Sequence, residues 1–418
     1  MVQLLVFADD LTGALDTAVQ FSKKGIRTAV QFKCNQTSVN HDDIDVLVIN
    51  TNSRHVSAQQ AYEIVKAQIL KWNNGSHCFF YKKTDSALRG NIGAECRAIM
   101  DTTPYSDLYF LPAFPDNGRT TYMGTQYYQG IPVHKSLISG DILSIVETSH
   151  IPTLLEQQMT DIDIVTLSVD QEIPQGNGTR RILVFDSRTN EDMQVIAQKI
   201  RNTGNYHLLA GCAGFAQHLP ELLHLKKQNK LSYRRTKGFL YVCGSINPVS
   251  TRQLECAEKA GFTRLTLTQE QKLMSGYFDT PDGKTFLQHV FQLCENHTPL
   301  IIDVTYPGGP DATSAYAKEH CIPEDQISGI IVRQLGVLIQ HWVKYRFDAT
   351  LMISGGDTLM ALADVLSCRN IDPVCEISSG SVLSQLKLDD QTVQIVSKSG
   401  GFGTETEIVD IWNALKAR

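Results

Sequence analysis

Several features that mark particular classes of protein are missing from this sequence. No uncharged apolar stretch approaches the roughly 20 residues that cross a bilayer. The first residues, MVQLLVFADD, lack the basic n-region, the long apolar h-region and the cleavage site of a signal peptide. Lysine and arginine are scattered and the formal net charge is −6, which disfavours nucleic acid as a partner. We therefore expect a cytoplasmic protein with neither a membrane nor a nucleic-acid role.

Cysteine patterns and the common nucleotide fingerprints are missing as well. The 10 cysteines include no C-x-x-C pair and no disulfide-like cluster, so we expect mostly small, buried apolar residues in a reducing compartment. Neither a Walker A sequence nor G-x-G-x-x-G occurs. An ordinary P-loop kinase and an enzyme with the usual dinucleotide fingerprint are both disfavoured.

The chain does contain enough apolar residues for two hydrophobic cores. Its 418 residues, 42% of them apolar, exceed the length at which one core usually stops growing. A polar, basic segment at 226–237 separates two halves, so we predict domains at 1–230 and 236–418, with a hinge at this segment. Two domains imply a cleft between them, where we expect the active site.

Short β-branched apolar runs alternate with longer amphipathic stretches in both halves. This pattern predicts an α/β fold in which each domain is a mostly parallel sheet flanked by helices. The predicted strands are 4–7, 46–49, 78–81, 108–111, 182–185, 207–210, 239–242, 300–304, 350–353 and 393–396. Predicted helices include 328–342, 359–366 and one that follows the first strand and stops at Gly25.

Ligands of parallel sheets collect beyond the carboxyl ends of strands, so the loops after the predicted strands are the places to search. Asp9 and Asp10 follow the first strand directly. Adjacent carboxylates there suit the binding of a metal ion or the acceptance of a proton from a substrate hydroxyl. The alternative is a helix N-cap, which aspartate forms well.

Three other loops of the first half carry cations. The loop at 81–93 combines basic, acidic and polar side chains with glycines, and arginine and lysine suit an anionic substrate. Its candidates are Lys82, Lys83, Asp85, Ser86, Arg89 and Asn91. Arg119, in the proline-containing loop at 112–121, and Arg54, after 46–49, are similar candidates. The alternatives are a solvated surface turn, a proline-fixed turn and a lone surface arginine.

The loops of the second half contain glycine and hydroxyl residues instead of cations. Main-chain N–H groups of such loops bind phosphate at helix N-termini, so we predict a nucleotide site, although a lone glycine cluster is more often a tight turn. Its candidates are Ser245, Gly355, Gly356, Asp357, Thr358, Gly400, Gly401 and Gly403. Asp357 and Thr358 are also placed either to reach Mg²⁺ or to cap a helix.

Five segments together resemble the four-carbon acid sugar kinases, a family once known as a domain of unknown function. They are ADDLTGA at 8–14, KKTDSALRGNIGAE at 82–95, PAFPDNGRTT at 112–121, SGGDT at 354–358 and SGGFG at 399–403. The segments are collinear with the family and span nearly the whole chain. The resemblance implies that the first domain binds a sugar acid, that the second binds ATP, and that ATP phosphorylates the terminal 4-hydroxyl.

Finer features of the resemblance bear on the substrate. The stretch YKKTDSALRGNIGAE is more similar to the D-threonate and D-erythronate kinases than to the 3-oxo-tetronate kinases, so D-threonate is favoured and a 3-oxo acid is the alternative. Ala87 departs from the threonine expected at its position, which leaves the stereochemical preference open. The oligomeric state, a homo-oligomer included, is open too.

Phosphoryl transfer depends mainly on positioning and on neutralising oxygen charge. We hypothesise that Asp10, Asp9 or Asp85 orients the attacking hydroxyl and accepts its proton. The predicted cations of the first half bind the sugar acid, and the glycine loops hold ATP with Mg²⁺, whose protein ligands the sequence does not identify. Two other readings stay open, namely a non-catalytic sensor of sugar acid and nucleotide, and an NAD-linked hydroxy-acid oxidoreductase.

Overall fold

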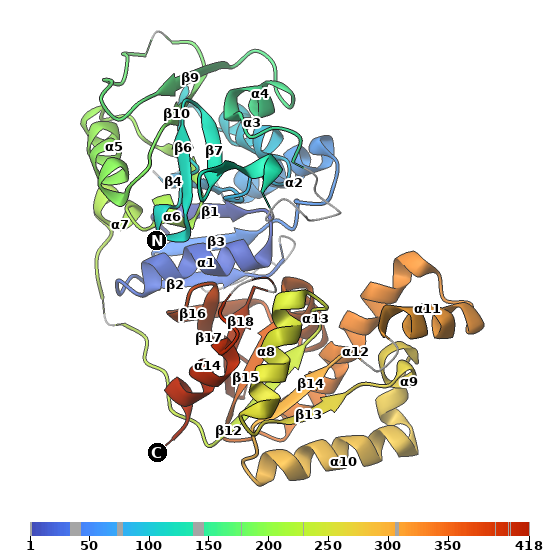
Figure 1. The fold of residues 1–418 in the computed structure, drawn as a ribbon. Helices are drawn as coiled ribbons and strands as arrows, with labels where there is room; N and C mark the ends of the chain where they lie inside the picture. Colours follow the sequence, from blue (N-terminus) through green and yellow to red (C-terminus); the bar gives the residue numbers. More distant parts are fainter. Residues whose placement is uncertain are drawn as a thin grey trace. The chain divides into compact units, whose positions relative to one another are not determined.

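The computed structural model describes residues 2–33, 43–72, 78–136, 146–176, 178–228, 230–305, 309–388, 390–399, 401 and 403–417. Contacts divide the chain into two compact units, Met1–Lys230 and Leu231–Arg418. Each unit has a mostly parallel sheet flanked by helices (Figure 1). The predicted α/β fold class is therefore confirmed.

The sheet of the first unit is parallel at every described pairing, in the order β2-β3-β1-β4-β11-β5-β10-β9. Its strands are β1 (Leu4–Ala8), β2 (Thr28–Gln31), β3 (Val46–Asn50), β4 (Phe79–Lys83), β5 (Asp107–Leu111), β9 (Asp163–Leu167), β10 (Arg181–Phe185) and β11 (Leu208–Gly211). A small antiparallel sheet contains β6 (Arg119–Tyr122), β7 (Thr125–Tyr128) and β8 (Ile131–Pro132). The small sheet carries the loop that follows β5 away from the main ladder.

The helices of the first unit begin and end where local chemistry favours it. They are α1 (Leu11–Ser22), α2 (Ala58–Trp72), α3 (Ile92–Thr102), α4 (Ile151–Glu156), α5 (Asn190–Asn202), α6 (Ala213–Ala216) and α7 (Leu219–Leu222). The side chain of Asp10 caps α1 by accepting a hydrogen bond from the Gly13 N–H. Gly25 follows α1 with a φ of 82°, a left-handed conformation that suits glycine.

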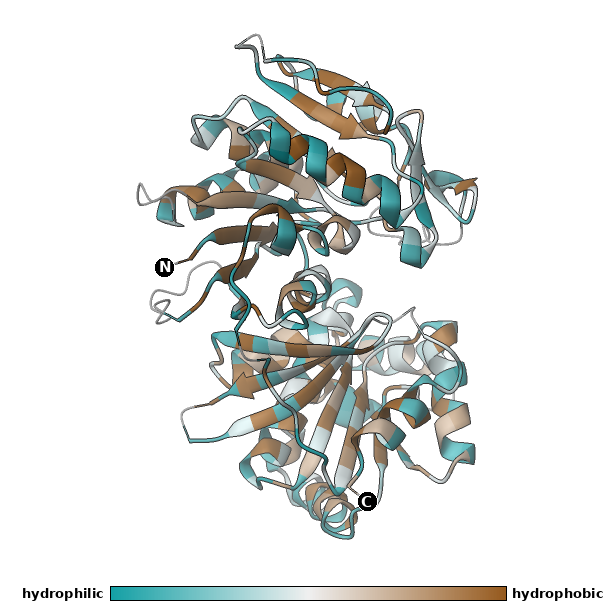
Figure 2. Ribbon diagram, turned by 90° about the vertical axis from the view of Figure 1, so that its left-hand side faces the viewer, coloured by the Kyte–Doolittle hydropathy of each residue, from teal (hydrophilic) through white to brown (hydrophobic). Residues whose placement is uncertain are grey.

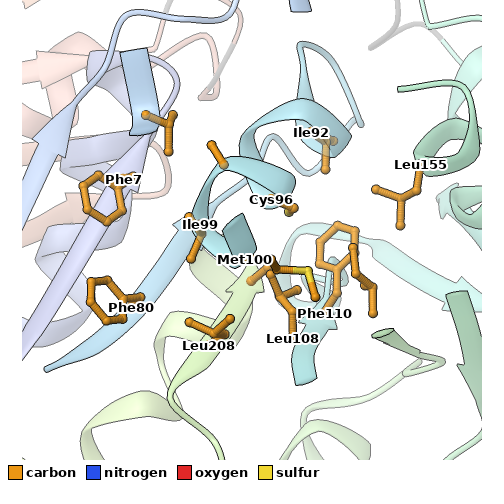
Figure 3. Packing of buried hydrophobic residues seen from close by; sticks show 14 of the residues in the cluster. Phe7, Phe80, Ile92, Cys96, Ile99, Met100, Leu108, Phe110, Leu155 and Leu208 are labelled. Carbon is orange, nitrogen blue, oxygen red and sulfur yellow. The ribbon is translucent and has the colours of Figure 1, made fainter. Parts of the chain in front are cut away.

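Helices α2, α3 and α4 cover one face of this sheet. Their apolar side chains pack against alternate residues of the strands, as Figure 3 shows for Met100 and Cys96 of α3 beside Leu108 and Phe110 of β5. Every residue of this cluster is nearly inaccessible to solvent, so the strands are held firmly on this side. The carboxyl ends of these strands therefore form a rigid platform for side chains.

The sheet of the second unit is parallel from β13 to β18 and antiparallel beyond, in the order β13-β14-β12-β15-β18-β17-β16. Its strands are β12 (Gly238–Cys243), β13 (Thr263–Thr266), β14 (Leu300–Asp303), β15 (Ala349–Ser354), β16 (Asn370–Ser378), β17 (Ser381–Lys387) and β18 (Thr392–Lys398). Its helices are α8 (Pro248–Lys259), α9 (Gln269–Leu273), α10 (Pro281–Glu295), α11 (Gly309–Glu319), α12 (Glu324–Lys344), α13 (Gly356–Val365) and α14 (Glu407–Leu415).

Helices α8 and α14 share one apolar cluster with this sheet. Leu254 of α8 and Ile408 of α14 pack with Tyr241 of β12 and Val396 of β18. In both units the strands are predominantly hydrophobic, whereas the helices also carry hydrophilic residues (Figure 2). This distribution is expected for parallel sheets covered by helices.

In each unit the strand order reverses beside a central strand. The chain passes from β1 to β2 and β3 on one side and then crosses to β4 on the other side of β1. In the second unit β14 and β15 likewise flank β12. Loops that leave such a switch point diverge and open a crevice at the carboxyl ends of the strands.

Two expectations about composition bear on the described ranges. Every cysteine within them is a free thiol, and most of these thiols are buried. Within the same ranges, no helix has both the length and the apolar character needed to cross a membrane.

Candidate functional site

The first cluster of functional side chains centres on an arginine that binds two adjacent carboxylates. Arg54 donates to Asp9 through Nε at 2.7 Å and Nη2 at 3.1 Å, and to Asp10 through Nη1 at 2.9 Å and Nη2 at 2.7 Å. The parallel register aligns Ala8 of β1 with Asn50 of β3, which brings the loops after these strands together. The sequence placed these three residues on separate loops, and the fold joins them in one ion cluster.

The two aspartates differ in access to solvent. The side chain of Asp9 is 3% exposed and that of Asp10 is 25% exposed. Burial alone would raise the pKa of Asp9, but Arg54, Lys82 and Lys83 outweigh this effect and hold the pKa below its ordinary value. Asp9 is therefore a buried, ionised partner of Arg54, whereas Asp10 is the carboxylate that a ligand can approach.

Lys82 lies in the interior beneath this cluster. Its Nζ is 2.9 Å from Oε2 of Glu95, the two side chains are 0% and 1% exposed, and Nζ also donates to the Phe7 carbonyl at 3.1 Å. Burial raises the pKa of Glu95 despite the attraction of Lys82, and the Asp9 carboxylate adds to the effect. The structure thus gives Lys82 buried protein partners, and its predicted contact with a substrate stays a prediction.

Glu95 and Ser53 belong to this cluster, and reasoning from the sequence missed both. The Ser53 hydroxyl donates to Glu95, and the Ser53 N–H donates to the Asp9 carbonyl at 3.0 Å. Glu95 therefore connects Lys82 to the loop that carries Arg54. Glu95 ends the quoted segment KKTDSALRGNIGAE, but only the fold shows that it faces Lys82.

Lys83 lies beside the cap of α1. A Cβ atom built on Gly13 would come within 2.5 Å of Oδ1 of Asp10 and 2.7 Å of Nζ of Lys83. Nζ itself donates to the Thr84 carbonyl at 2.9 Å. The absence of a side chain at position 13 is thus what allows the ammonium group and the carboxylate to converge there.

Asp85 and Arg89 form a second ion pair near the first cluster. Nε of Arg89 is 2.7 Å from Oδ2 of Asp85, and Nη2 is 3.0 Å from Oδ1. Burial would raise the pKa of Asp85, but Arg89 and Arg54 hold it well below its ordinary value. The Asp85 carboxylate raises the pKa of Arg89 above its ordinary value, and Asp10 acts in the same direction.

The remaining candidates of the first half support the neighbouring loops. Asn91 donates to the carbonyls of Ser53 and Val56, at 3.0 and 2.9 Å, so its amide braces the Arg54 loop. Gln126, which the sequence did not reveal, donates at 3.1 Å to the carbonyls of Ser86 and Pro112. Gln126 therefore ties the loop after β4 to the loop after β5.

Arg119 is buried on β6, with its guanidinium 5.3 Å from the ring centroid of Tyr128. Burial raises the pKa of the Cys212 thiol to about 11, and Lys83 and Arg119 both oppose this shift. The two cations therefore lie near the same thiol. The loop after β5 thus brings its arginine toward the end of β4.

The glycine loops of the second unit converge in the same way. A Cβ on Gly244 would lie 2.7 Å from Oγ1 of Thr358, and a Cβ on Gly401 would lie 3.6 Å from Nδ2 of Asn247. The loops after β12, β15 and β18 therefore touch one another through glycines. Ser245 lies on the first of these loops, and its Oγ accepts a hydrogen bond from the Asn247 N–H at 3.2 Å.

The turn before α13 places a glycine directly ahead of a helix N-terminus. Gly355 has a φ of 101°, which favours glycine, and Gly356 is the first residue of the helix. Asp357 is exposed in the first turn, whereas Thr358 is buried. Gly403 has a φ of 92°, and Gly400 lies outside the described residues. The free N–H groups of the first turn suit an anion.

Metal ligands are not preassembled in the part of the chain that the structure describes, because no three His, Cys, Asp or Glu side chains group there as a metal site.

Comparisons with known proteins agree with this division of the chain. The family model described as a sugar-binding N-terminal domain matches residues 4–219, and the one described as a nucleotide-binding C-terminal domain matches residues 240–408. The two carboxyl-end sites described above thus lie in a sugar-binding and a nucleotide-binding domain, the parts of a phosphotransferase. The chain belongs to the four-carbon acid sugar kinase family and is an ATP-dependent phosphotransferase.

Curated relatives match almost the whole chain. A D-threonate kinase of Salmonella typhimurium is 27% identical and covers 98% of this chain and 97% of its own length. A D-erythronate kinase of Heliobacterium modesticaldum is 25% identical over 90% of this chain and 88% of its own length. A 3-oxo-tetronate kinase of Burkholderia multivorans is 24% identical over 95% of this chain and 93% of its own length.

One solved structure shares the fold over its entire length. It is a Salmonella typhimurium protein described as a putative tRNA synthase, with a TM-score of 0.79, 20% sequence identity and coverage of 100% of both chains. A likeness at this identity shows the fold alone.

The space at Gly13 gives a first prediction. Gly13→Ala places a methyl group against Asp10 and Lys83, so we expect kcat to fall about 100-fold, since small misplacements of reacting groups cost this much. Helix α1 should persist, because alanine favours helix. Steady-state kinetics and thermal unfolding measure the two effects.

Gly329→Ala is the matched control, because a Cβ built on Gly329 of α12 would meet no atom within 4 Å apart from the nearby backbone of its own helix. This variant should keep wild-type kcat and gain about 1 kcal/mol of stability. Equal activity of the two variants would show that the contact at Gly13 does not matter for turnover.

The Asp85–Arg89 pair gives a second prediction, for stability against pH. Asp85→Asn should lower the free energy of unfolding at pH 7 by about 3 kcal/mol, because it removes a buried carboxylate from its pair and leaves the partly buried Arg89 without a partner. The Asp85 carboxyl has a lower pKa in the folded protein than in the unfolded chain, so it stabilises the fold at pH values above its ordinary pKa of 3.8. This contribution is lost as the pH falls through the lower pKa of the folded state. The difference between wild type and variant should therefore shrink below pH 4 in denaturant titrations.

The control for this experiment is Asp348→Asn. Asp348 pairs with Arg234 at 3.1 Å on the surface, where an ion pair contributes about 1 kcal/mol or less. A pH-independent difference for Asp85→Asn would contradict the role of the ionised pair.

Proposed function

We propose that the enzyme transfers the γ-phosphoryl group of ATP to the terminal 4-hydroxyl of a four-carbon acid sugar, with D-threonate favoured and D-erythronate next. The observation that carries the proposal is the cluster at the ends of β1, β3 and β4, where Arg54 holds Asp9 and Asp10 beside Lys83 and the Asp85–Arg89 pair. This reaction needs a carboxylate that accepts the proton of the hydroxyl and cations that bind the acid group of the substrate.

Asp10 orients the attacking hydroxyl and accepts its proton. Its side chain is the more exposed of the two bound by Arg54, and a carboxylate can take a proton late in a loose transition state. Asp9 and Arg54 hold Asp10 in place. This assignment selects one of the three carboxylates that the sequence left open, and it makes Asp85 the partner of Arg89.

Lys83, Arg89 and Arg119 bind the carboxylate and the hydroxyls of the acid. Lys82 and Arg54 act through the protein, because their hydrogen bonds go to Glu95 and to the two aspartates. Because the donors of Arg54 are directed at the two aspartates, this arginine holds their carboxylates in place and does not exchange these bonds for contacts with the substrate. Ser86 and Asn91 support the loops that carry these cations.

ATP binds at the glycine loops of the second unit. The main-chain N–H groups near Gly355, Gly356, Gly401 and Gly403 bind its phosphates. Asp357 is exposed at the start of α13 and would hold Mg²⁺ with Thr358 beside it. The ion would neutralise charge on the phosphate oxygens. The predicted interdomain cleft and the hinge at 226–237 stay predictions.

The substrate preference is the third prediction, and coupled ADP release tests it. D-Threonate should give the highest kcat/KM among D-threonate, D-erythronate and 3-oxo-tetronates, each assayed with and without Mg²⁺, because the loop at 81–93 resembles the D-threonate kinases. A maximum for a 3-oxo acid would place the enzyme with its 3-oxo-tetronate relatives. Thermal stabilisation by acid and ATP without ADP release would indicate a sensor and refute the proposal.

The fourth prediction concerns Asp10. Asp10→Asn removes the proton acceptor, so kcat should fall about 10²- to 10⁴-fold, while the Kd for ATP stays close to wild type. The measurements are steady-state turnover and calorimetric titration with ATP.

Glu221→Gln is the control for this amide substitution, because Glu221 forms a surface pair with Lys24 at 3.0 Å. It should leave kcat unchanged. Full turnover by Asp10→Asn would remove Asp10 from the mechanism.

A further inference from the structure

The glycine loops that would hold the nucleotide contain no positive side chain. The stretches 244–247, 354–358 and 399–403 include neither lysine nor arginine, and Asp357 adds a negative charge. Main-chain N–H groups supply only partial charges, whereas a triphosphate carries several full negative charges. A cation close to these loops would therefore contribute strongly to binding.

Lys398 lies at the junction of these loops. It is the last residue of β18 and pairs with Ser354, the last residue of β15. Its carbonyl accepts a hydrogen bond from the Gly355 N–H at 3.2 Å. Lys398 thus joins the turn before α13 to the loop at 399–403, which begins at the next residue.

The side chain of Lys398 lies on the face that α8 and α14 cover. Alternate residues of a strand share a face, and Val396 packs in the cluster that contains Leu254 of α8 and Ile408 of α14. The titratable groups that act on Lys398 agree with this placement, since they are Cys243 at the end of β12 and Glu407 on α14. The lysine head therefore lies where the loops after β12 and β18 meet.

The environment of this amine is costly for an ammonium ion. Lys398 is 2% exposed, and Nζ donates to the Ser399 carbonyl at 3.0 Å. Burial lowers the pKa of Lys398 to about 8, although Cys243 and Glu407 act in the opposite direction. A buried cation with a perturbed pKa beside glycine loops is a candidate for ligand binding.

We propose that Lys398 is the cation that binds the phosphate groups of the nucleotide, and that nucleotide binding is coupled to uptake of a proton by this amine. The inference rests on the proposed nucleotide site and adds a residue that the motif alone did not assign. Phosphate oxygens replace the water that burial has removed from the ammonium group, so the charged form is stabilised when the nucleotide is present.

The direction of the coupling follows from the charges. A nearby anion raises the pKa of an ammonium group, so free protein with a half-protonated Lys398 at pH 8 takes up a proton when ATP binds. With a pKa of about 8, the uptake at pH 8 approaches about half a proton per ATP. The affinity for ATP should fall as the pH rises above 8, because the free protein then holds less of the charged form.

Isothermal titration of the full chain with MgATP, without a sugar acid, tests the proposal. Measurements at pH 8 in two buffers of different ionisation enthalpy give the proton uptake. Lys398→Met should weaken ATP binding by about 10- to 100-fold, as loss of a hydrogen bond to a charged group does, and should abolish the uptake. Lys398→Arg should bind ATP better than Lys398→Met and show no uptake, because arginine does not titrate at this pH.

Lys272→Met is the matched control for removing a buried lysine. Lys272 is 2% exposed in the same unit, and its Nζ donates to the Val304 carbonyl and to Thr313 at 3.2 and 3.0 Å. Burial also lowers the pKa of Lys272. This variant should keep both the affinity for ATP and the proton uptake. Far-ultraviolet circular dichroism and thermal unfolding verify that each variant is folded.

The outcomes separate this inference from the proposed function. Wild-type affinity and uptake in a folded Lys398→Met variant would overturn the inference and show that the lysine only braces its own loop. Equal losses in Lys398→Met and Lys272→Met would overturn it as well. Failure of the wild-type chain to bind ATP would refute the proposed nucleotide site itself.

Discussion

The contact of Arg54 with two adjacent aspartates is the interaction on which the first site depends. Two carboxylates next to each other in a mostly buried position repel, and each loses hydration. A guanidinium offers donors in a planar fork, and here four hydrogen bonds of 2.7 to 3.1 Å reach both groups. The arginine therefore holds both carboxylates side by side.

The surrounding backbone is shaped around this contact. A Cβ on Gly90 would lie 3.2 Å from Oδ2 of Asp9 and 3.4 Å from Cγ of Arg54, and Gly90 has a φ of 90°. The main chain at Gly90 can lie this close to the Asp9–Arg54 ion pair because glycine has no side chain. Asn91, the next residue, holds the carbonyls of the Arg54 loop. These contacts hold the side chains of the site in place, which reduces the entropy lost on binding.

The two proposed sites offer different kinds of groups for binding an anion. The first places full charges of both signs at the ends of its central strands, in a Lys82–Glu95 pair and an Asp9–Arg54 pair. The second offers main-chain N–H groups at glycine turns and a helix N-terminus, with the side chain of Lys398 close to them. Side-chain ions discriminate among small acids by geometry, whereas peptide dipoles suit the repeating oxygens of a polyphosphate.

The sequence predicted the elements whose signals are local. The strands β1, β3 and β5 are continuous apolar runs, and the corresponding predicted ranges lie within one residue of the observed strands. β16 and β17 were missed because Asp372, Pro373 and Ser384 interrupt the apolar pattern, and their pairing is a tertiary effect.

The candidate site shows the same limit. Each predicted side chain lies in a segment identified from the sequence, but the partner of each could not be read from that segment. Lys82 was assigned to a substrate because its motif is basic, while its bond to Glu95 depends on how α3 packs against β4. The role of Gln126 depends likewise on a hairpin that returns to the end of β4. Long-range pairing leaves no trace in local composition.

Arg119 is attached to the first unit differently from the other cations. Lys83 ends a strand of the main ladder, whereas Arg119 belongs to the small sheet of β6, β7 and β8. Its place relative to the aspartates is therefore set by a hairpin and by Gln126, not by the register of parallel strands. A longer or shorter hairpin would move this one charge while the hydrophobic core stayed unchanged, so a change confined to the hairpin would alter the distance between this cation and the aspartates.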